Sequence, residues 1–165
     1  MIVPWQKWQR PRYGQEDSYV KGMKWLEPCS MVEDWGCGKM AYAKKYRDGP
    51  YIGIDGTGPT ADMIADLSTY RSQVPGLFMR GILEHNHDWR VILQNALDSF
   101  TQRMFLMLYR PLQDEEKVII QEQPVELDLP RDELMGMVNE FHIASDRIDG
   151  ATHGYETCLY LEKQA

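Results

Sequence analysis

The chain has 165 residues, of which 43% are hydrophobic and 26% are charged, and these proportions predict one folded domain with its own core. It contains no run of about 18 apolar residues, and residues 1–12 lack the apolar stretch of a secretion signal, so we expect neither a membrane span nor export. The net charge of −7 argues against nucleic acid as a partner. Three cysteines without zinc-site or CxxC spacing fit a cytoplasmic, reducing environment.

The first 28 residues differ in composition from the rest, and we expect them to precede a ligand-binding domain over residues 29–165. This segment begins with aromatic and basic side chains, which suit stacking on a base, a sugar or a cofactor. They equally suit packing on the domain surface or on a second subunit. A short helix is expected from Asp17 or Ser18 to Leu26, because apolar residues recur at helical spacing and Pro28 ends the pattern.

A strand, a glycine turn and a second strand form the most informative part of the sequence. Residues 31–34 are expected to form a buried strand that ends in an acid, and a helix over 39–47 follows two glycines. The next strand, 51–55, ends in Asp55, which lies 19 residues after Gly36. This layout is typical of a nucleoside-binding α/β unit, because glycines let a backbone approach the ligand.

Further strands and helices are expected up to the carboxyl terminus. They are strands at 63–67 and 77–80, a helix from Asp88, a strand at 103–109, a helix at 131–141, and a hairpin of strands 142–148 and 156–161. The acidic stretch 114–133 is interpreted as a solvated face. The order predicts an α/β fold with a mostly parallel twisted sheet, covered on both faces and closed by an antiparallel hairpin.

The glycine turn fits two kinds of cofactor, and Asp34 separates them. Residues 36–41 match the dinucleotide pattern GxGxxA, so a small NAD-binding oxidoreductase is one interpretation. A dinucleotide would place its pyrophosphate near the start of the helix, where the Asp34 carboxylate would repel it. S-adenosylmethionine has no phosphate and carries a cationic amino group and a sulfonium, so a nearby acid favours it.

Four motifs in order resemble those of class I S-adenosylmethionine-dependent methyltransferases. Residues 33–38 (Glu-Asp-Trp-Gly-Cys-Gly) resemble the family's motif I, and residues 52–55 (Ile-Gly-Ile-Asp) resemble motif II. Residues 65–67 (Ala-Asp-Leu) resemble the segment after the third strand. Residues 80–85 resemble the end of the fourth strand, with its Leu-Glu-His triplet. The resemblance implies a reduced version of the Rossmann-like methyltransferase fold, since two crossovers are short and no large insertion is present.

The resemblance also implies a set of cofactor contacts at the ends of the strands. They are Asp34, Gly36, Gly38 and Arg80 for the methionine portion, Asp55 and Gly56 for the ribose and adenosine, and Asp66 and Leu67 for the adenine. S-adenosylmethionine would be the cofactor and S-adenosylhomocysteine the product. No metal is implied.

His85 is the first candidate for a general base, which methyl transfer needs only when the acceptor must lose a proton. A structural histidine bonded at a turn is the alternative. The spacing of His85, His87 and Asp88 does not match that of a metal site. Asp88 instead suits the N-cap of the following helix. His153 lies in the terminal hairpin, where it either reaches a substrate or stays solvated.

These features predict methyl transfer to a small molecule or a glycan, at a hydroxyl oxygen. The Asn/Asp-Pro-Pro-aromatic motif of enzymes that methylate exocyclic or amide nitrogens is missing after the fourth strand, where residues 81–84 read Gly-Ile-Leu-Glu. A cofactor-binding subunit that depends on a partner is the alternative from another class, because no substrate lid is evident. A homo-oligomer is also compatible with the sequence.

Overall fold

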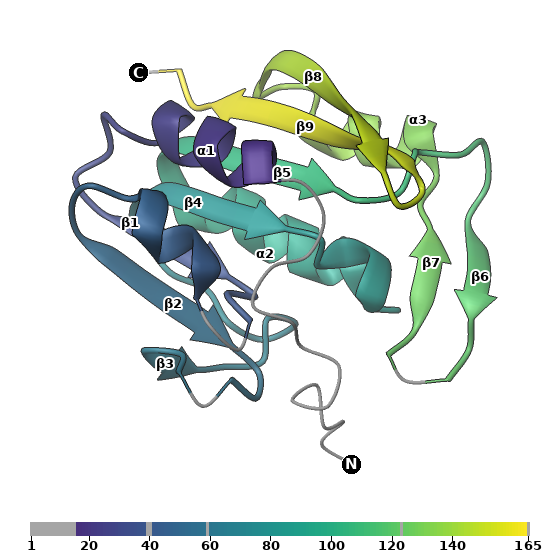
Figure 1. Ribbon diagram of the computed structural model, residues 1–165, viewed down its shortest axis with the longest axis horizontal. Helices are drawn as coiled ribbons and strands as arrows, with labels where there is room; N and C mark the ends of the chain where they lie inside the picture. Colours follow the sequence, from purple (N-terminus) through teal and green to yellow (C-terminus); the bar gives the residue numbers. More distant parts are fainter. Residues whose placement is uncertain (1–15, 39–40, 59, 123, 165) are drawn as a thin grey trace.

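The computed structural model describes residues 16–38, 41–58, 60–122 and 124–164, and a seven-stranded sheet forms its centre (Figure 1). The strands of this sheet are β1 (Val32–Trp35), β2 (Tyr51–Asp55), β3 (Met63–Ile64), β4 (Val74–Arg80), β5 (Phe100–Leu108), β8 (His142–Ala151) and β9 (Gly154–Glu162). Their order is β3-β2-β1-β4-β5-β9-β8, with β1 to β5 parallel and β9 and β8 antiparallel. This arrangement confirms the predicted α/β fold with a carboxyl-terminal antiparallel hairpin.

Helices cover both faces of the sheet, as the alternation of strands and helices predicts. They are α1 (Glu16–Trp25), α2 (Trp89–Ser99) and α3 (Arg131–Val138), with short 3-10 helices η2 (Tyr42–Tyr46) and η3 (Leu83–His85). Figure 1 shows α1 in front of the sheet and α2 behind it. Within the described residues, no helix has the length and apolar character needed to cross a membrane.

Alternate side chains of the central strands pack into two separate hydrophobic cores. On β4, Phe78 joins the core under α1, whereas Leu77 and Met79 join the larger core under α2 and α3. On the neighbouring strand, Phe105 stacks on Phe78 with ring centroids 5.4 Å apart. Because successive side chains of a strand point to opposite faces, one apolar run such as 77–79 is buried on both sides.

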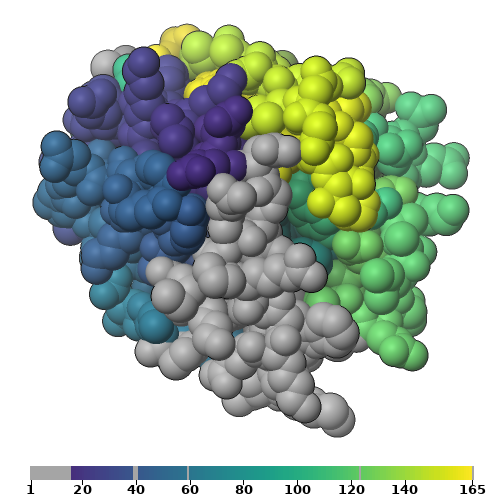
Figure 2. Space-filling model, viewed as in Figure 1, coloured from purple at the N-terminus to yellow at the C-terminus, as the bar shows by residue number. Residues whose placement is uncertain are grey.

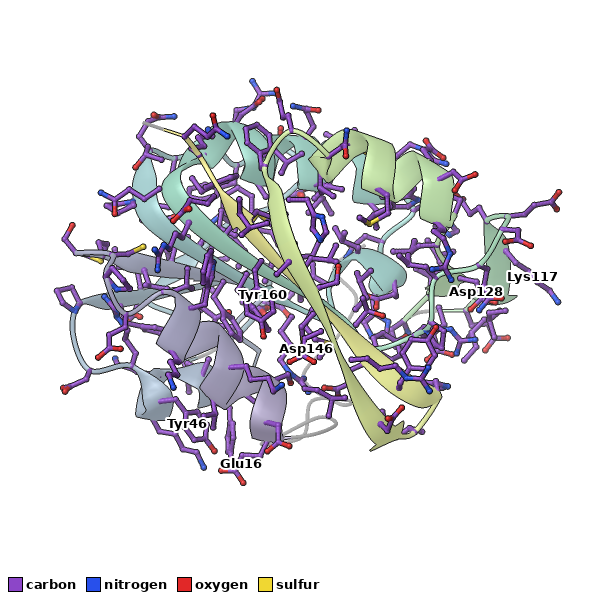
Figure 3. All side chains as sticks on the ribbon, turned by 90° about the horizontal axis from the view of Figure 1, so that it is seen from above. Glu16, Tyr46, Lys117, Asp128, Asp146 and Tyr160 are labelled. Carbon is purple, nitrogen blue, oxygen red and sulfur yellow. The ribbon has the colours of Figure 1, made fainter. Side chains whose placement is uncertain are left out.

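Polar contacts also attach α1 to the sheet and to η2. The Tyr46 hydroxyl donates to Glu16, and Lys21 pairs with Asp146 of β8. Figure 3 shows Glu16 and Tyr46 together at the edge that α1 covers, with Asp146 on the strand that crosses above. The helix therefore connects the parallel and antiparallel halves of the sheet.

A second, two-stranded sheet lies outside the main one and was not predicted. It consists of β6 (Lys117–Ile120) and β7 (Glu126–Asp128), paired antiparallel with Lys117 opposite Asp128. Figure 3 labels this pair at the end of the molecule far from α1, and in Figure 2 the same green segment forms the rim opposite the blue amino-terminal half. The acids that flank β6 are exposed, as expected for a solvated face, whereas Glu126 and Asp128 of β7 are partly buried.

Other boundaries also differ from prediction for local reasons. The helix expected over 39–47 is a 3-10 helix from Tyr42 in the described residues, because Ala41 adopts a left-handed backbone (φ 43°) that interrupts an α-helix. The strand expected over 63–67 ends at Ile64, because the chain turns at Asp66. The aromatic and basic residues before position 16 lie outside the described residues, so their expected role stays a prediction.

Candidate functional site

The glycine turn after β1 combines a packing requirement with an open side. Gly36 and Gly38 both have left-handed backbones, with φ of 77° and 69°. The Gly36 N–H donates to the Ile54 carbonyl of β2 (2.7 Å), and a Cβ at this position would lie 2.0 Å from Cδ1 of Ile82. A Cβ on Gly38 would meet none of the described residues within 4 Å. A side chain would therefore not fit at Gly36, whereas the described residues leave space beside Gly38. That space suits the close approach of a ligand to the backbone.

Asp55 is held at the end of β2 by the backbone around it. Its Oδ2 accepts from the Gly38 N–H (3.0 Å), and its Oδ1 accepts from the N–H groups of Thr57 (3.0 Å) and Gly58 (3.1 Å). These three donors fix the carboxylate against the glycine turn. Each carboxylate oxygen can accept more than one bond, so Asp55 keeps capacity for hydroxyl donors of a ligand.

Asp34 is a buried acid beside the same turn. Only 3% of the residue is exposed, and its Oδ2 accepts from the Tyr51 hydroxyl. The pKa of Asp34 is raised to about 7, mainly by burial and also by the nearby Asp55 charge, while the Tyr51 hydrogen bond and Arg80 oppose the rise. The site therefore holds an acid close to its titration point at neutral pH, and a cation nearby would stabilise its charged form. Tyr51 is 17 residues from Asp34 in the chain, so no local pattern indicates it as the partner of this acid.

Arg80 lies at the end of β4 and is held from two directions. Its Nη2 pairs with Glu156 Oε1 of β9 (3.1 Å), and Nε donates to the Ser18 hydroxyl of α1 (2.8 Å). The guanidinium also lies over the Tyr19 ring, 4.2 Å from its centroid. The Arg80 and Glu156 side chains are only 7% and 1% exposed. Arg80 is thus already oriented by long-range contacts, and its expected contact with the methionine portion stays a prediction.

The residues expected to bind adenosine lie after β2 and β3. Gly56 is exposed, and among the described residues a Cβ there would approach only the Ala65 carbonyl, at 3.8 Å. Asp66 is exposed, and its Oδ1 accepts from the N–H and the hydroxyl of Ser68 (2.9 and 2.7 Å). Leu67 is partly buried against the larger core. Asp66 therefore forms a turn, and its expected bond to adenine stays a prediction.

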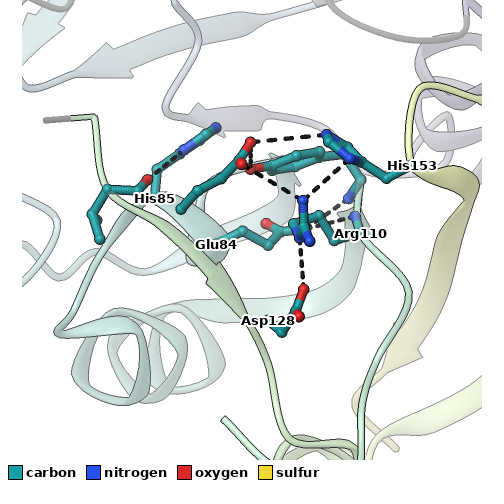
Figure 4. A network of polar contacts seen from close by, with 8 residues as sticks. Glu84, His85, Arg110, Asp128 and His153 are labelled. Atoms are coloured by element: carbon teal, nitrogen blue, oxygen red, sulfur yellow. Dashed lines mark hydrogen bonds and ion pairs between the residues drawn. The ribbon is translucent and has the colours of Figure 1, made fainter. Parts of the chain in front are cut away.

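His85 ends η3, next to the buried acid Glu84 (Figure 4). Its Nδ1 lies 2.9 Å from the Val125 carbonyl, and because a carbonyl only accepts, Nδ1 carries the proton in this contact. The neutral ring then has its lone pair on Nε2. Burial lowers the pKa of His85, partly opposed by the Val125 bond and by Glu126. His85 therefore stays neutral at neutral pH and can accept a proton.

Glu84 turns inward instead of facing a ligand. Its Oε1 accepts from the Tyr109 N–H (2.6 Å), and among the described residues its buried Oε2 has no hydrogen-bond partner. Burial raises the pKa of Glu84 to about 7. The Leu-Glu-His triplet therefore supplies one residue that attaches η3 to β5 and one that faces the polar network described next.

Four further side chains form this network at the end of β5 (Figure 4). Arg110 donates from Nε to Asp128 Oδ1 (2.7 Å), and its Nη1 lies 3.5 Å from Glu126 Oε2. Arg110 Nη1 also lies 3.1 Å from Nδ1 of His153. A guanidinium only donates, so His153 Nδ1 accepts here. The lone pair of His153 Nδ1 is therefore bound to Arg110, and the neutral His153 ring carries its proton on Nε2.

A hollow of about 280 Å³ lies elsewhere, between the end of α1 and the segment before β2. It is lined by Lys24, Glu27 and Tyr46 among others, at the amino ends of the strands. None of the residues predicted to bind a cofactor lines it. In open α/β sheets ligands bind outside the carboxyl ends of the strands, so we assign no function to this hollow.

The architecture matches solved structures of methyltransferases, although no protein-family model and no curated sequence matches the chain. 1,6-Didemethyltoxoflavin-N1-methyltransferase of Burkholderia thailandensis, with bound S-adenosylhomocysteine, has a TM-score of 0.71 and 14% identity, covering 91% of this chain and 78% of that one. The chain has the fold of class I methyltransferases. Magnesium protoporphyrin IX methyltransferase (ChlM) of Synechocystis PCC 6803, with bound S-adenosylmethionine, has a TM-score of 0.69 and 12% identity, covering 99% of this chain and 92% of that one. The N-methyltransferase NodS of Bradyrhizobium japonicum has a TM-score of 0.65 and 9% identity, covering 99% of this chain and 90% of that one.

In this methyltransferase fold the predicted residues separate into two groups. The structure brings Asp34, Gly36, Gly38 and Asp55 together around one turn. His85 joins a second group, the network with Arg110, which the sequence analysis did not predict because its members are far apart in the chain. In the part of the chain that the structure describes, no cluster of His, Cys, Asp and Glu side chains could hold a metal ion.

Proposed function

We propose that the protein binds S-adenosylmethionine at the glycine turn and transfers its methyl group to a hydroxyl oxygen of a small molecule or glycan. The observation that carries this proposal is the pair of buried acids, Asp34 and Asp55, on either side of the glycine turn in a methyltransferase fold. The proposal is also supported by solved methyltransferases of the same fold with S-adenosylmethionine or S-adenosylhomocysteine bound.

The residues around the turn suit the chemistry of this cofactor. The open side of Gly38 offers space for a ligand, and Asp34 would accept a cationic amino group in its buried position. Asp55 would accept bonds from the ribose hydroxyls, since its orientation is set by backbone donors before any ligand arrives. Gly56, Asp66 and Leu67 are proposed to contact the adenosine.

The acceptor would lie between the turn and His85. When bound, S-adenosylmethionine supplies a methyl carbon activated by its sulfonium, and the electrons of the broken C–S bond leave with the sulfur of S-adenosylhomocysteine. Catalysis then depends largely on holding the acceptor oxygen in line with that carbon. His85 Nε2 would take the hydroxyl proton as the new O–C bond forms, which is the role of a general base.

Isothermal titration with S-adenosylhomocysteine and with NAD⁺ tests the cofactor. We expect binding of the first ligand only. Asp55→Ala should weaken it about fivefold to 150-fold, because the loss of a buried hydrogen-bonding group costs about 1–3 kcal/mol. Asp48→Ala, an exposed acid before β2, is the matched control and should bind like the wild type. Binding of NAD⁺ without S-adenosylhomocysteine would overturn the proposal in favour of an oxidoreductase.

Turnover against a panel of hydroxyl acceptors tests the enzymatic part separately. Transfer of labelled methyl from S-adenosylmethionine to an acceptor oxygen, lost in His85→Asn while S-adenosylhomocysteine still binds, is the expected result. Cofactor binding with no transfer by the isolated chain would instead support a subunit that depends on a partner. Transfer that persists in His85→Asn would remove the general-base role.

A further inference from the structure

The β6–β7 hairpin contributes to the candidate site through a backbone atom. Val125 lies just before β7, and its carbonyl accepts from Nδ1 of His85, 40 residues earlier in the chain. The hydrogen bond made by one ring nitrogen of a histidine determines which nitrogen carries the proton. The hairpin can therefore decide whether Nε2 is able to act as a base.

We propose that the β6–β7 hairpin, clamped by Arg110, is a positioning element that holds His85 in the tautomer with its lone pair on Nε2. This inference rests on the proposed function, because it assumes that His85 serves as the base. It assigns positioning roles to Arg110, Glu126 and Tyr109. None of these residues needs to touch the acceptor.

The clamp consists of one cation and two acids of β7. Arg110 lies two residues after the end of β5, and it binds both Asp128 (2.7 Å) and Glu126 (3.5 Å). These acids are two residues apart on a strand, so they lie on the same face. All three side chains are 14–17% exposed, which limits screening by water. A guanidinium presents several donors in a fixed plane, so one arginine can hold the hairpin at two points.

The same clamp also sets the plane of the His85 ring. Tyr109 stacks on His85 with ring centroids 5.1 Å apart and an interplanar angle of 21°. The Tyr109 hydroxyl donates to Glu126 Oε1 (2.9 Å), the acid that Arg110 also contacts. Movement of the hairpin would therefore displace both the Val125 carbonyl and the ring that His85 stacks on.

The charged groups around His85 agree with a neutral ring. Burial is the largest influence and lowers the pKa of His85. The Glu126 charge favours the protonated form of the His85 ring, whereas Arg110 and His153 disfavour it. His153 is itself joined to this cluster, 3.8 Å from Glu126 Oε1 and 3.1 Å from Arg110. A ring that stays neutral has a defined tautomer, which can be measured.

The test is ¹⁵N NMR of the histidine side chains in the full-length protein, which contains four histidines. His85→Gln identifies the His85 signals. The wild type should show protonated Nδ1 and unprotonated Nε2 at neutral pH, with a preference of about tenfold or more from a buried hydrogen bond. Arg110→Lys keeps the charge but loses the planar two-point contact, so the two tautomers should approach equal populations. Arg103→Lys, at the other end of β5 and paired with Glu162, is the matched control.

Tyr109→Phe provides a second variant that keeps the ring stack and removes only the hydroxyl bond to Glu126. It should shift the tautomer ratio in the same direction by a smaller factor. The inference is overturned if wild-type His85 is protonated on Nε2, or if both Arg110→Lys and Tyr109→Phe keep the wild-type ratio. Because the spectra need no cofactor or acceptor, they distinguish failure of this inference from failure of S-adenosylhomocysteine binding in the titrations above.

Discussion

Replacing Asp34 by asparagine should remove a pH dependence from the free energy of unfolding. Burial raises the pKa of Asp34 from 3.8 to about 7 in the folded state. A folded-state pKa above the unfolded value means that the native protein holds the proton more tightly. This group therefore stabilises the fold fully below pH 3.8, and that contribution falls as pH rises and is lost above about pH 7.

The magnitude follows from the interval between the two pKa values. From pH 5 to pH 7 the folded protein keeps the Asp34 proton while the unfolded chain has lost it, and each pH unit is worth about 1.4 kcal/mol. Between pH 5 and pH 8 the free energy of unfolding of the wild type should therefore fall by about 3 kcal/mol relative to that of Asp34→Asn. Asparagine keeps the shape and an acceptor for the Tyr51 hydroxyl, so the two proteins should be closest in stability at pH 5.

Guanidinium unfolding at pH 5, 6, 7 and 8 measures this difference. Comparing the two proteins cancels the contributions of Glu84, whose pKa is also raised, and of His85, whose pKa is lowered. Asp48→Asn, at an exposed position, should give a difference from wild type that does not change with pH. A wild-type minus Asp34→Asn difference that stays constant across this range would refute the argument that burial controls this carboxyl.

Two other predictions concern the same end of the sheet. Gly38→Ala should cost about 1 kcal/mol for its left-handed backbone and weaken S-adenosylhomocysteine binding. Gly36→Ala should cost at least about 1 kcal/mol more because its methyl group meets Ile82, and denaturant and calorimetric titrations measure both effects. Glu84→Gln should leave stability at pH 8 unchanged or higher, since burial disfavours the charged form. Glu84→Ala should lose about 2 kcal/mol by unpairing the Tyr109 N–H, as measured by unfolding at pH 8.

The parallel strands were predictable because local sequence determines them. β2 was predicted with its observed bounds, since a short apolar run lies between Asp48-Gly49-Pro50 and an acid. β6 was missed because acids flank it and all of its residues are exposed. The three β-branched residues 118–120 were the available signal for a strand. Their exposure left no alternation between buried and polar positions to detect.

The candidate site was predictable to the extent that its contacts are local. Asp34 and Asp55 lie at the ends of adjacent strands, so their proximity followed from the predicted order. The pairing of Arg80 with Glu156, 76 residues apart, depends on where β9 inserts into the sheet. The partners of His85 likewise depend on a hairpin that no local pattern predicted.

This division between local and long-range contacts bears on what determines the acceptor. Asp34, the glycine turn and Asp55, which we propose to bind the cofactor, lie within residues 34–58 on neighbouring parallel strands. The network around His85 is instead assembled from η3, the end of β5, the β6–β7 hairpin and the turn at His153. Solved structures with this fold and 12–14% identity are methyltransferases for ligands as unlike as 1,6-didemethyltoxoflavin and magnesium protoporphyrin IX. We therefore expect the residues that select the acceptor to lie outside the parallel strands that these folds share.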